Sequence, residues 1–171
     1  LLKLSGVWTG TCFGRTSDNL NGFYENKFIR ETLVKKILGD LNCDPLGVNK
    51  LPKISLHVKE TNLRKILHQL VEKDGYRNNM PWLYKDPKLT LIWQVFDKAF
   101  PEAKWIFVKR DKESIINSCL KTSFLEQHSR EPEFFNKLVD EYLERIKILK
   151  KNFLNFKEIS STELIEENYQ S

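Results

Sequence analysis

Apolar positions recur along the chain with two different patterns. Spacing by threes and fours predicts amphipathic helices over 25–41, 60–73, 89–100, 115–122 and 135–153. Short apolar runs bounded by charge, proline or glycine predict strands at 82–84 and 105–108, with a further strand candidate at 156–160. Strands that alternate with helices of this length are typical of an α/β domain with a mainly parallel sheet.

The run WIFV at 105–108 is the clearest of the predicted strands. Four consecutive bulky apolar residues favour a parallel strand that is covered on both faces. Asp111 follows it at a position suited to capping the next helix. Near the other end of the chain, Ser160 and Glu163 have the spacing of a capping box that opens a last short helix. The opening LLKLSG is typical of the end of a helix closed by Gly6.

Length and charge narrow the classes of function. The 171 residues are long enough for one domain, and we predict a single domain over 1–171. The net charge of +5 favours an anionic ligand, but the basic residues are mixed with acids, so we expect no nucleic-acid partner. No apolar run is long enough to span a bilayer, so no membrane span is expected.

Three cysteines, Cys12, Cys43 and Cys119, share no C-x-x-C spacing. A disulfide framework or a zinc site is therefore not expected, and a reducing, cytoplasmic compartment is the simpler expectation. No other cluster with metal-ligand spacing stands out, so we predict no metal.

Candidate chemistry gathers where predicted strands end. In open parallel sheets, ligands bind beyond the carboxyl ends of the strands, and both Lys85 and Arg110 follow such ends. Arg110 carries a planar fork of donors suited to a phosphate, and Ser114 and Ser118 lie one turn apart on the next helix. These residues predict a site for a terminal phosphate. A solvated arginine beside small surface residues is the alternative interpretation.

Several segments taken together resemble the sulfotransferase family. YKDPKL at 84–89 is followed by FPEAKWIFVKR and by the eight-residue step from Arg110 to Ser118. KDPKL is similar to the KDPRL of bacterial and phage-type members, with Lys88 in place of arginine. DNLNGFYEN at 18–26 resembles a segment that follows the first helix in such members, and FKEISSTELIEEN resembles their late strand and helix.

The resemblance implies transfer of a sulfuryl group from 3′-phosphoadenosine 5′-phosphosulfate (PAPS) to a hydroxyl or amine. The acceptor would be a small molecule, a carbohydrate or another such compound, and the product nucleotide 3′,5′-adenosine bisphosphate. The implied fold is a three-layer, P-loop-NTPase-like sandwich around a mainly parallel sheet. Arg110 and Ser118, with Ser114, would hold the 3′-phosphate.

The transfer step needs a cation near the leaving oxygen and a base near the acceptor. Lys85 is the candidate cation, with a plain surface lysine as its alternative. Glu25 is the first candidate base and Asp86 the second. Two structural roles stay open beside these: a first-turn carboxylate for Glu25, and a turn-forming residue for Asp86 before Pro87.

The family's phosphosulfate-binding loop has no counterpart in this sequence. Because LLKLSG is interpreted as the end of the first helix, we expect the loop ahead of Leu1 and describe the fold as N-terminally truncated. A non-catalytic or fragmentary sulfotransferase-like domain that binds a nucleotide or partner is therefore the second hypothesis. A small-molecule kinase is the third, although no GK[ST] loop is present in the sequence.

Overall fold

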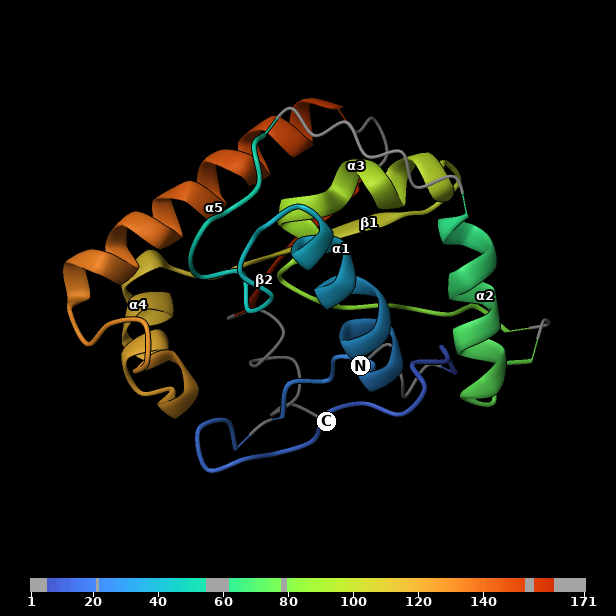
Figure 1. Cartoon of the computed structure of the whole chain (residues 1–171), viewed down its shortest axis with the longest axis horizontal. Helices are drawn as coiled ribbons and strands as arrows, with labels where there is room; N and C mark the ends of the chain where they lie inside the picture. The colour runs from blue at the N-terminus through green and yellow to red at the C-terminus, as the bar shows by residue number, and fades with distance from the viewer. Residues whose placement is uncertain (1–5, 21, 55–61, 78–79, 153–155, 162–171) are drawn as a thin grey trace. The chain divides into compact units, whose positions relative to one another are not determined.

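A computed structural model describes residues 6–20, 22–54, 62–77, 80–152 and 156–161. The chain divides into two compact units, Leu1–Pro101 and Glu102–Ser171, and each is described by itself (Figure 1). Within the described residues, the architecture is mixed α/β, as predicted, with five α-helices and a two-stranded parallel sheet. The helix end predicted at 1–6 lies largely outside the described residues, as does nearly all of the short helix after Ser160.

The first helical segment of the amino-terminal unit begins after a buried asparagine. Asn26 Oδ1 accepts the backbone N–H of Ile29 at 3.0 Å, which satisfies a donor that the first helical turn leaves open. The segment starts at residue 27 and runs through a π-helix, η1 (Ile29–Val34), into α1 (Lys35–Asp40). It confirms the helix predicted over 25–41, although its widened middle was not foreseen.

Two further helices complete the described helices of this unit. Helix α2 (Leu63–Lys73) buries Leu63, Leu67 and Val71, which recur by fours on one face. Helix α3 (Leu89–Ala99) buries a second apolar face, and it ends at Phe100 because Pro101 disfavours a helical conformation in the residue before it. Both helices match the predicted segments within a few residues.

The strand predicted at 82–84 is reduced to one bridge. Trp82 pairs in parallel with Trp8, through hydrogen bonds from Trp8 N to the Pro81 oxygen and from Leu83 N to the Trp8 oxygen, both 2.9 Å. The remaining residues of this stretch are extended and lead Lys85 and Asp86 into the turn before α3.

The carboxyl-terminal unit contains the described sheet. Strands β1 (Trp105–Lys109) and β2 (Phe156–Ser160) pair in parallel, with Phe107 opposite Glu158. Parallel neighbours need a crossover connection, and α4 (Lys112–Leu120), a short 3₁₀ turn (Ser123–Leu125) and α5 (Pro132–Asn152) provide it. Figure 1 shows the two strands side by side.

The prediction that 105–108 is covered on both faces is wrong. Ile106 and Val108 are 39% and 58% exposed, whereas Trp105 and Phe107, on the other face, are half-buried. Lys150 of α5 lies over the Phe107 ring and also contacts Glu158. Here the fully apolar run indicates a strand but not the burial of both faces of that strand.

Candidate functional site

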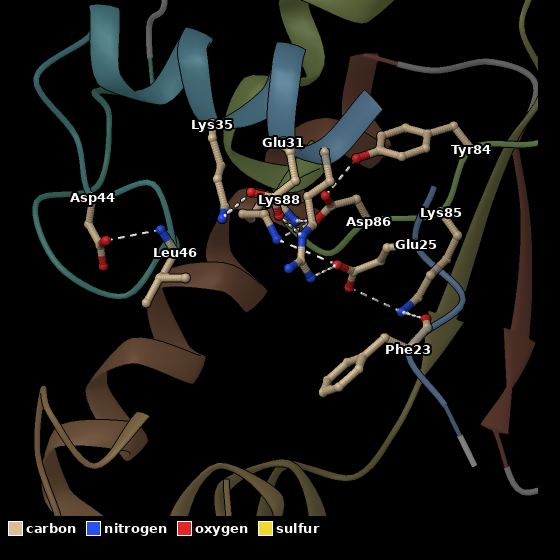
Figure 2. A network of polar contacts seen from close by, with 11 residues as sticks. Phe23, Glu25, Glu31, Lys35, Asp44, Leu46, Tyr84, Lys85, Asp86 and Lys88 are labelled. Atoms are coloured by element: carbon tan, nitrogen blue, oxygen red, sulfur yellow. Dashed lines mark hydrogen bonds and ion pairs between the residues drawn. The ribbon is translucent and has the colours of Figure 1, made fainter. Parts of the chain in front are cut away.

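A buried carboxylate surrounded by three cations forms the centre of the candidate site (Figure 2). Glu25 is 4% exposed, and its Oε2 lies 2.9 Å from Arg30 Nη1 and 3.8 Å from Lys88 Nζ. Its Oε1 lies 3.5 Å from Lys85 Nζ. One carboxylate oxygen is thus held firmly, and the other has a single, longer contact among the described residues.

Lys85 is the exposed member of the cluster. Its side chain is 52% exposed, and its ammonium group donates a hydrogen bond of 2.9 Å to the backbone oxygen of Phe23. An ammonium group has three donors, so this bond fixes the position of Lys85 and leaves donors for a ligand. The arrangement places an exposed cation, Lys85, next to a buried carboxylate, Glu25.

Asp86 lies inside the same network but is fully engaged. Its side chain is completely buried; Oδ2 accepts the Tyr84 hydroxyl at 2.7 Å, and Oδ1 accepts Lys88 Nζ at 2.9 Å and Lys88 N at 2.8 Å. Its backbone oxygen accepts the N–H of Leu89 at the start of α3. These contacts hold the turn before α3, and the role of Asp86 as second candidate base stays a prediction.

Tyr84 holds Asp86 from the other side. The phenol ring stacks on Phe96, with ring centroids 6.2 Å apart. Burial, together with the adjacent charge of Asp86, raises the pKa of Tyr84 far above its ordinary value. Tyr84 therefore keeps its proton and remains a donor to Asp86 throughout the neutral range.

Arg30 is clamped between a ring and two carboxylates. Its guanidinium carbon lies 3.7 Å from the centroid of the Phe13 ring, and its Nε bonds Glu31 at 2.9 Å. Burial alone would lower the pKa of Arg30, but its bonds with Glu25 and Glu31 outweigh that effect and raise it. Burial alone would raise the pKa of Glu31, but its hydrogen bonds with Lys35 and Arg30 outweigh that effect and lower it. Arg30 therefore stays charged beside Glu25.

A second polar cluster supports the chain next to Glu25. Asn26 Nδ2 donates to the Thr9 oxygen at 3.1 Å and to Asp74 Oδ2 at 2.7 Å, while Asp74 Oδ2 also accepts the N–H of Thr11. Gly10 lies against this cluster with φ of +66°, and a Cβ there would come within 2.1 Å of Asp74 Oδ2. Together with the bond that Oδ1 accepts from Ile29 N, these contacts give every polar group of the Asn26 side chain a partner. They fix the backbone at the residue that follows Glu25.

The predicted phosphate site belongs to the carboxyl-terminal unit. Arg110 directly follows β1, is exposed, and forms no hydrogen bond or ion pair with the described residues. Ser118 is exposed on α4. Burial raises the pKa of the Cys119 thiol, and the charge of Arg110 partly opposes that shift.

Ser114 takes part in the cap of α4 through its backbone. Its N–H donates to Asp111 Oδ1 at 2.7 Å. This bond is the main cause that holds the pKa of Asp111 below its ordinary value, and it confirms the predicted cap of α4. The role of the Ser114 hydroxyl at the phosphate site stays a prediction.

The structure therefore brings Lys85 and Glu25 together, links Asp86 to them through Lys88, and forms no direct bond between Arg110 and either serine. Sequence reasoning missed the contributions of Arg30, Lys88 and Tyr84. Arg30 follows Glu25 by five positions, a spacing that does not face its partner on a regular α-helix. For Lys88 the signal was present, since it replaces the arginine of the resembling motif.

Within the described ranges, no group of three or more histidine, cysteine or acidic side chains is placed to hold a metal ion. Cys12, Cys43 and Cys119 are free thiols. No helix among those described is both long and apolar enough to cross a membrane.

Comparisons with known proteins identified no relative: no protein-family model, no curated protein and no solved structure matches this chain.

Proposed function

We propose that this chain is a sulfotransferase domain in which Lys85 and Glu25 act on a sulfuryl group passing from PAPS to a hydroxyl or amine. The observation that carries the proposal is the 3.5 Å separation of Lys85 Nζ and Glu25 Oε1. These two residues lie far apart in the sequence. The resemblance of their two segments to sulfotransferase motifs independently assigned them the roles of cation and base.

The proposed reaction uses both groups at once. As the acceptor oxygen or nitrogen forms its bond to sulfur, Glu25 Oε1 takes the acceptor proton. The bond between sulfur and the bridging oxygen breaks, and its electron pair remains on the phosphate of the departing 3′,5′-adenosine bisphosphate. Lys85 stabilises the negative charge that gathers on this oxygen.

Arg30 and Lys88 support this assignment without taking part in bond making. Both approach Oε2 of Glu25, at 2.9 and 3.8 Å, and among the described residues they leave Oε1 to its contact with Lys85. The carboxylate is therefore oriented before a substrate arrives. Such preorganisation is the main means by which proteins lower the barrier of a reaction that moves charge.

Nucleotide binding is the second half of the proposal. Arg110 is exposed and forms no ion pair with the described residues, so its fork of donors is available to the 3′-phosphate, and Ser118 supplies a hydroxyl. The full three-layer, P-loop-NTPase-like sandwich belongs to this proposal as well. The described sheet contributes two of its parallel strands.

The transfer of ³⁵S-labelled sulfuryl groups from PAPS to a panel of phenol, sugar and amine acceptors tests the reaction. Replacing Lys85 with methionine is expected to lower the rate by about 10²- to 10³-fold, the usual effect of removing one group that stabilises developing charge. Lys35→Met is the matched control, because Lys35 bonds Glu31 and does not contact Glu25. Equal rates for Lys85→Met and the unchanged protein would refute the proposed role.

A calorimetric titration tests nucleotide recognition separately. The protein is expected to prefer 3′,5′-adenosine bisphosphate to 5′-AMP, and Arg110→Ala is expected to abolish that preference. Equal binding of the two nucleotides, or no binding of either, would contradict the assignment of the 3′-phosphate site.

A non-catalytic nucleotide- or partner-binding domain is the second candidate function. It is favoured by the burial of Glu25, which is only 4% exposed and holds three cations together as a structural ion cluster would. This candidate predicts binding of the bisphosphate without transfer to any acceptor.

A further inference from the structure

The segment that carries Glu25 contains a shift in strand register. Residues 11–14 and 23–27 run antiparallel, and Cys12 faces Asn26 between two hydrogen bonds, Phe13 N to the Glu25 oxygen and Lys27 N to the Thr11 oxygen, both 2.9 Å. A regular ladder would next bond Glu25 N to the Phe13 oxygen. Instead, Tyr24 N donates to the Phe13 oxygen at 3.0 Å, so two residues face one.

This β-bulge is made by a residue that is poorly suited to it. Tyr24 has a φ of +54°, in the left-handed region where glycine is the usual residue of such a bulge. Its ring lies against Gly22, whose Cβ, if present, would be 3.2 Å from Tyr24 Cε2 and 3.3 Å from the Gly14 carbonyl carbon. Gly22 therefore leaves room for the Tyr24 ring.

We propose that Tyr24 is a positioning residue whose left-handed conformation directs the Glu25 carboxylate to its three cations. Successive side chains of a strand alternate between its two faces, and an inserted residue changes that alternation at one point. Here the insertion comes immediately before Glu25, while the bond from Phe13 N to the Glu25 oxygen keeps the backbone of Glu25 in the ladder.

A second irregularity lies just beyond. At the end of η1 the backbone N–H of Lys35 donates to the backbone oxygen of Arg30, five residues earlier. Arg30 is also the residue whose Nη1 lies 2.9 Å from Glu25 Oε2. Strained or rare backbone on both sides of one buried carboxylate is typical of sites where a side chain must be held in one place. The catalytic meaning of this placement rests on the proposed function, whereas the placement itself does not.

Carboxylate labelling tests the inference without nucleotide or acceptor. The folded protein is treated with a water-soluble carbodiimide and glycine ethyl ester, and labelling of each carboxylate is followed by peptide mass spectrometry. Glu25 is expected to be protected, and Glu31, whose side chain is 43% exposed, provides the internal control.

Two substitutions separate the backbone from the ring. Tyr24→Gly removes the ring but adopts the left-handed region freely, so Glu25 is expected to stay protected. Tyr24→Val disfavours that region more than tyrosine does, because its side chain is β-branched, and labelling of Glu25 is expected to rise roughly 5-fold. If Tyr24→Val does not fold, Tyr24→Asn takes the place of glycine and Tyr24→Thr, also β-branched, that of valine.

Protection of Glu25 in the valine or threonine variant would overturn the inference, as would its exposure in the glycine or asparagine variant. The transfer assay then separates this result from the proposed function. Exposure of Glu25 in Tyr24→Val, with no transfer by the unchanged protein, would support the positioning role and refute the sulfotransferase assignment. Transfer by the unchanged protein, with Glu25 protected in Tyr24→Val, would support the sulfotransferase assignment and refute the positioning role of Tyr24.

Discussion

The cluster around Glu25 and the end of β1 at Arg110 both present cations, but they hold them differently. Glu25 binds Arg30, Lys85 and Lys88, which come from two segments far apart in the sequence, and only Lys85 is well exposed. Arg110 is exposed without a hydrogen bond or ion pair to any described residue. Beside it, Ser114 and Asp111 bond within one helical turn.

The difference shows that the two regions would meet a ligand in different states. The Glu25 cluster is oriented before binding, at the cost of bringing several charges out of water. Arg110 keeps its hydration and its side-chain freedom, which a bound ligand would take away. Substitutions in the first region should therefore change stability and activity together, whereas substitutions in the second should change binding alone.

The largest effect is expected for Glu25→Gln. Loss of the charge leaves Arg30 and Lys88 without their common partner, and breaking such a buried pair costs about 3–5 kcal/mol of unfolding free energy. Urea unfolding measures it. Glu31→Gln, which removes a more exposed carboxylate in the helical segment that follows Glu25, should cost no more than about 1 kcal/mol. Similar losses in the two variants would show that the cluster is not the stabilising feature described here.

The support beneath the cluster is tested by Gly10→Ala. The new Cβ would disturb the bond between Asn26 and Asp74 and would be strained at a φ of +66°, so the loss should be about 2–4 kcal/mol. Gly39→Ala is the matched control. It lies in α1 with no atom within 4 Å of the added carbon, and it should stabilise the protein by about 0.5–1 kcal/mol. A neutral Gly10→Ala would contradict the close packing at this point.

Tyr84 gives the cluster a dependence on alkaline pH. The pKa of Tyr84 is raised in the folded protein, so the unfolded chain loses this proton first, near its ordinary pKa of about 10. The stabilisation is complete below that pH and declines above it, by up to about 1.4 kcal/mol per pH unit. Unfolding free energies of the unchanged protein and Tyr84→Phe, measured between neutral pH and pH values above 10, should differ in slope by this amount. Parallel curves would contradict the burial of the phenol.

The smallest change in stability is expected at the other region. Arg110→Ala should alter the unfolding free energy by less than about 0.5 kcal/mol, because the side chain is exposed. It should nevertheless weaken binding of 3′,5′-adenosine bisphosphate by about 10- to 100-fold, the value of one or two charge-assisted hydrogen bonds. Arg130→Ala, at another exposed arginine of the same unit, should leave that affinity unchanged. A loss of stability in Arg110→Ala without a loss of affinity would contradict the difference described between Arg110 and the Glu25 cluster.

Local features of the fold could be predicted from the sequence, whereas the contacts between the side chains of the site could not. The periodicity of α2 and α3 and the cap at Asp111 depend on neighbours within a few residues, and the structure confirms them. The same reasoning overestimated the strand at 82–84, because a short apolar run does not reveal how many partners the chain will pair with.

The cluster itself was only partly predictable. The resemblance suggested Lys85 and Glu25, and the structure places them 3.5 Å apart. Arg30 contacts Glu25 from five positions away, between a bulge at Tyr24 and a π-helix that begins at Ile29. Neither irregularity has a reliable sequence signature, since Tyr24 occupies a position where glycine is usual.

The most direct measurement of the central claim is a double-mutant cycle on the sulfuryl transfer rate, with Lys85→Met, Glu25→Gln and the combined variant, each assayed where it is folded. Because the two side chains are proposed to act as one unit, the combined variant should be about as slow as the slower single variant. Single variants as fast as the unchanged protein, or losses that multiply in the combined variant, would contradict a joint role for Lys85 and Glu25.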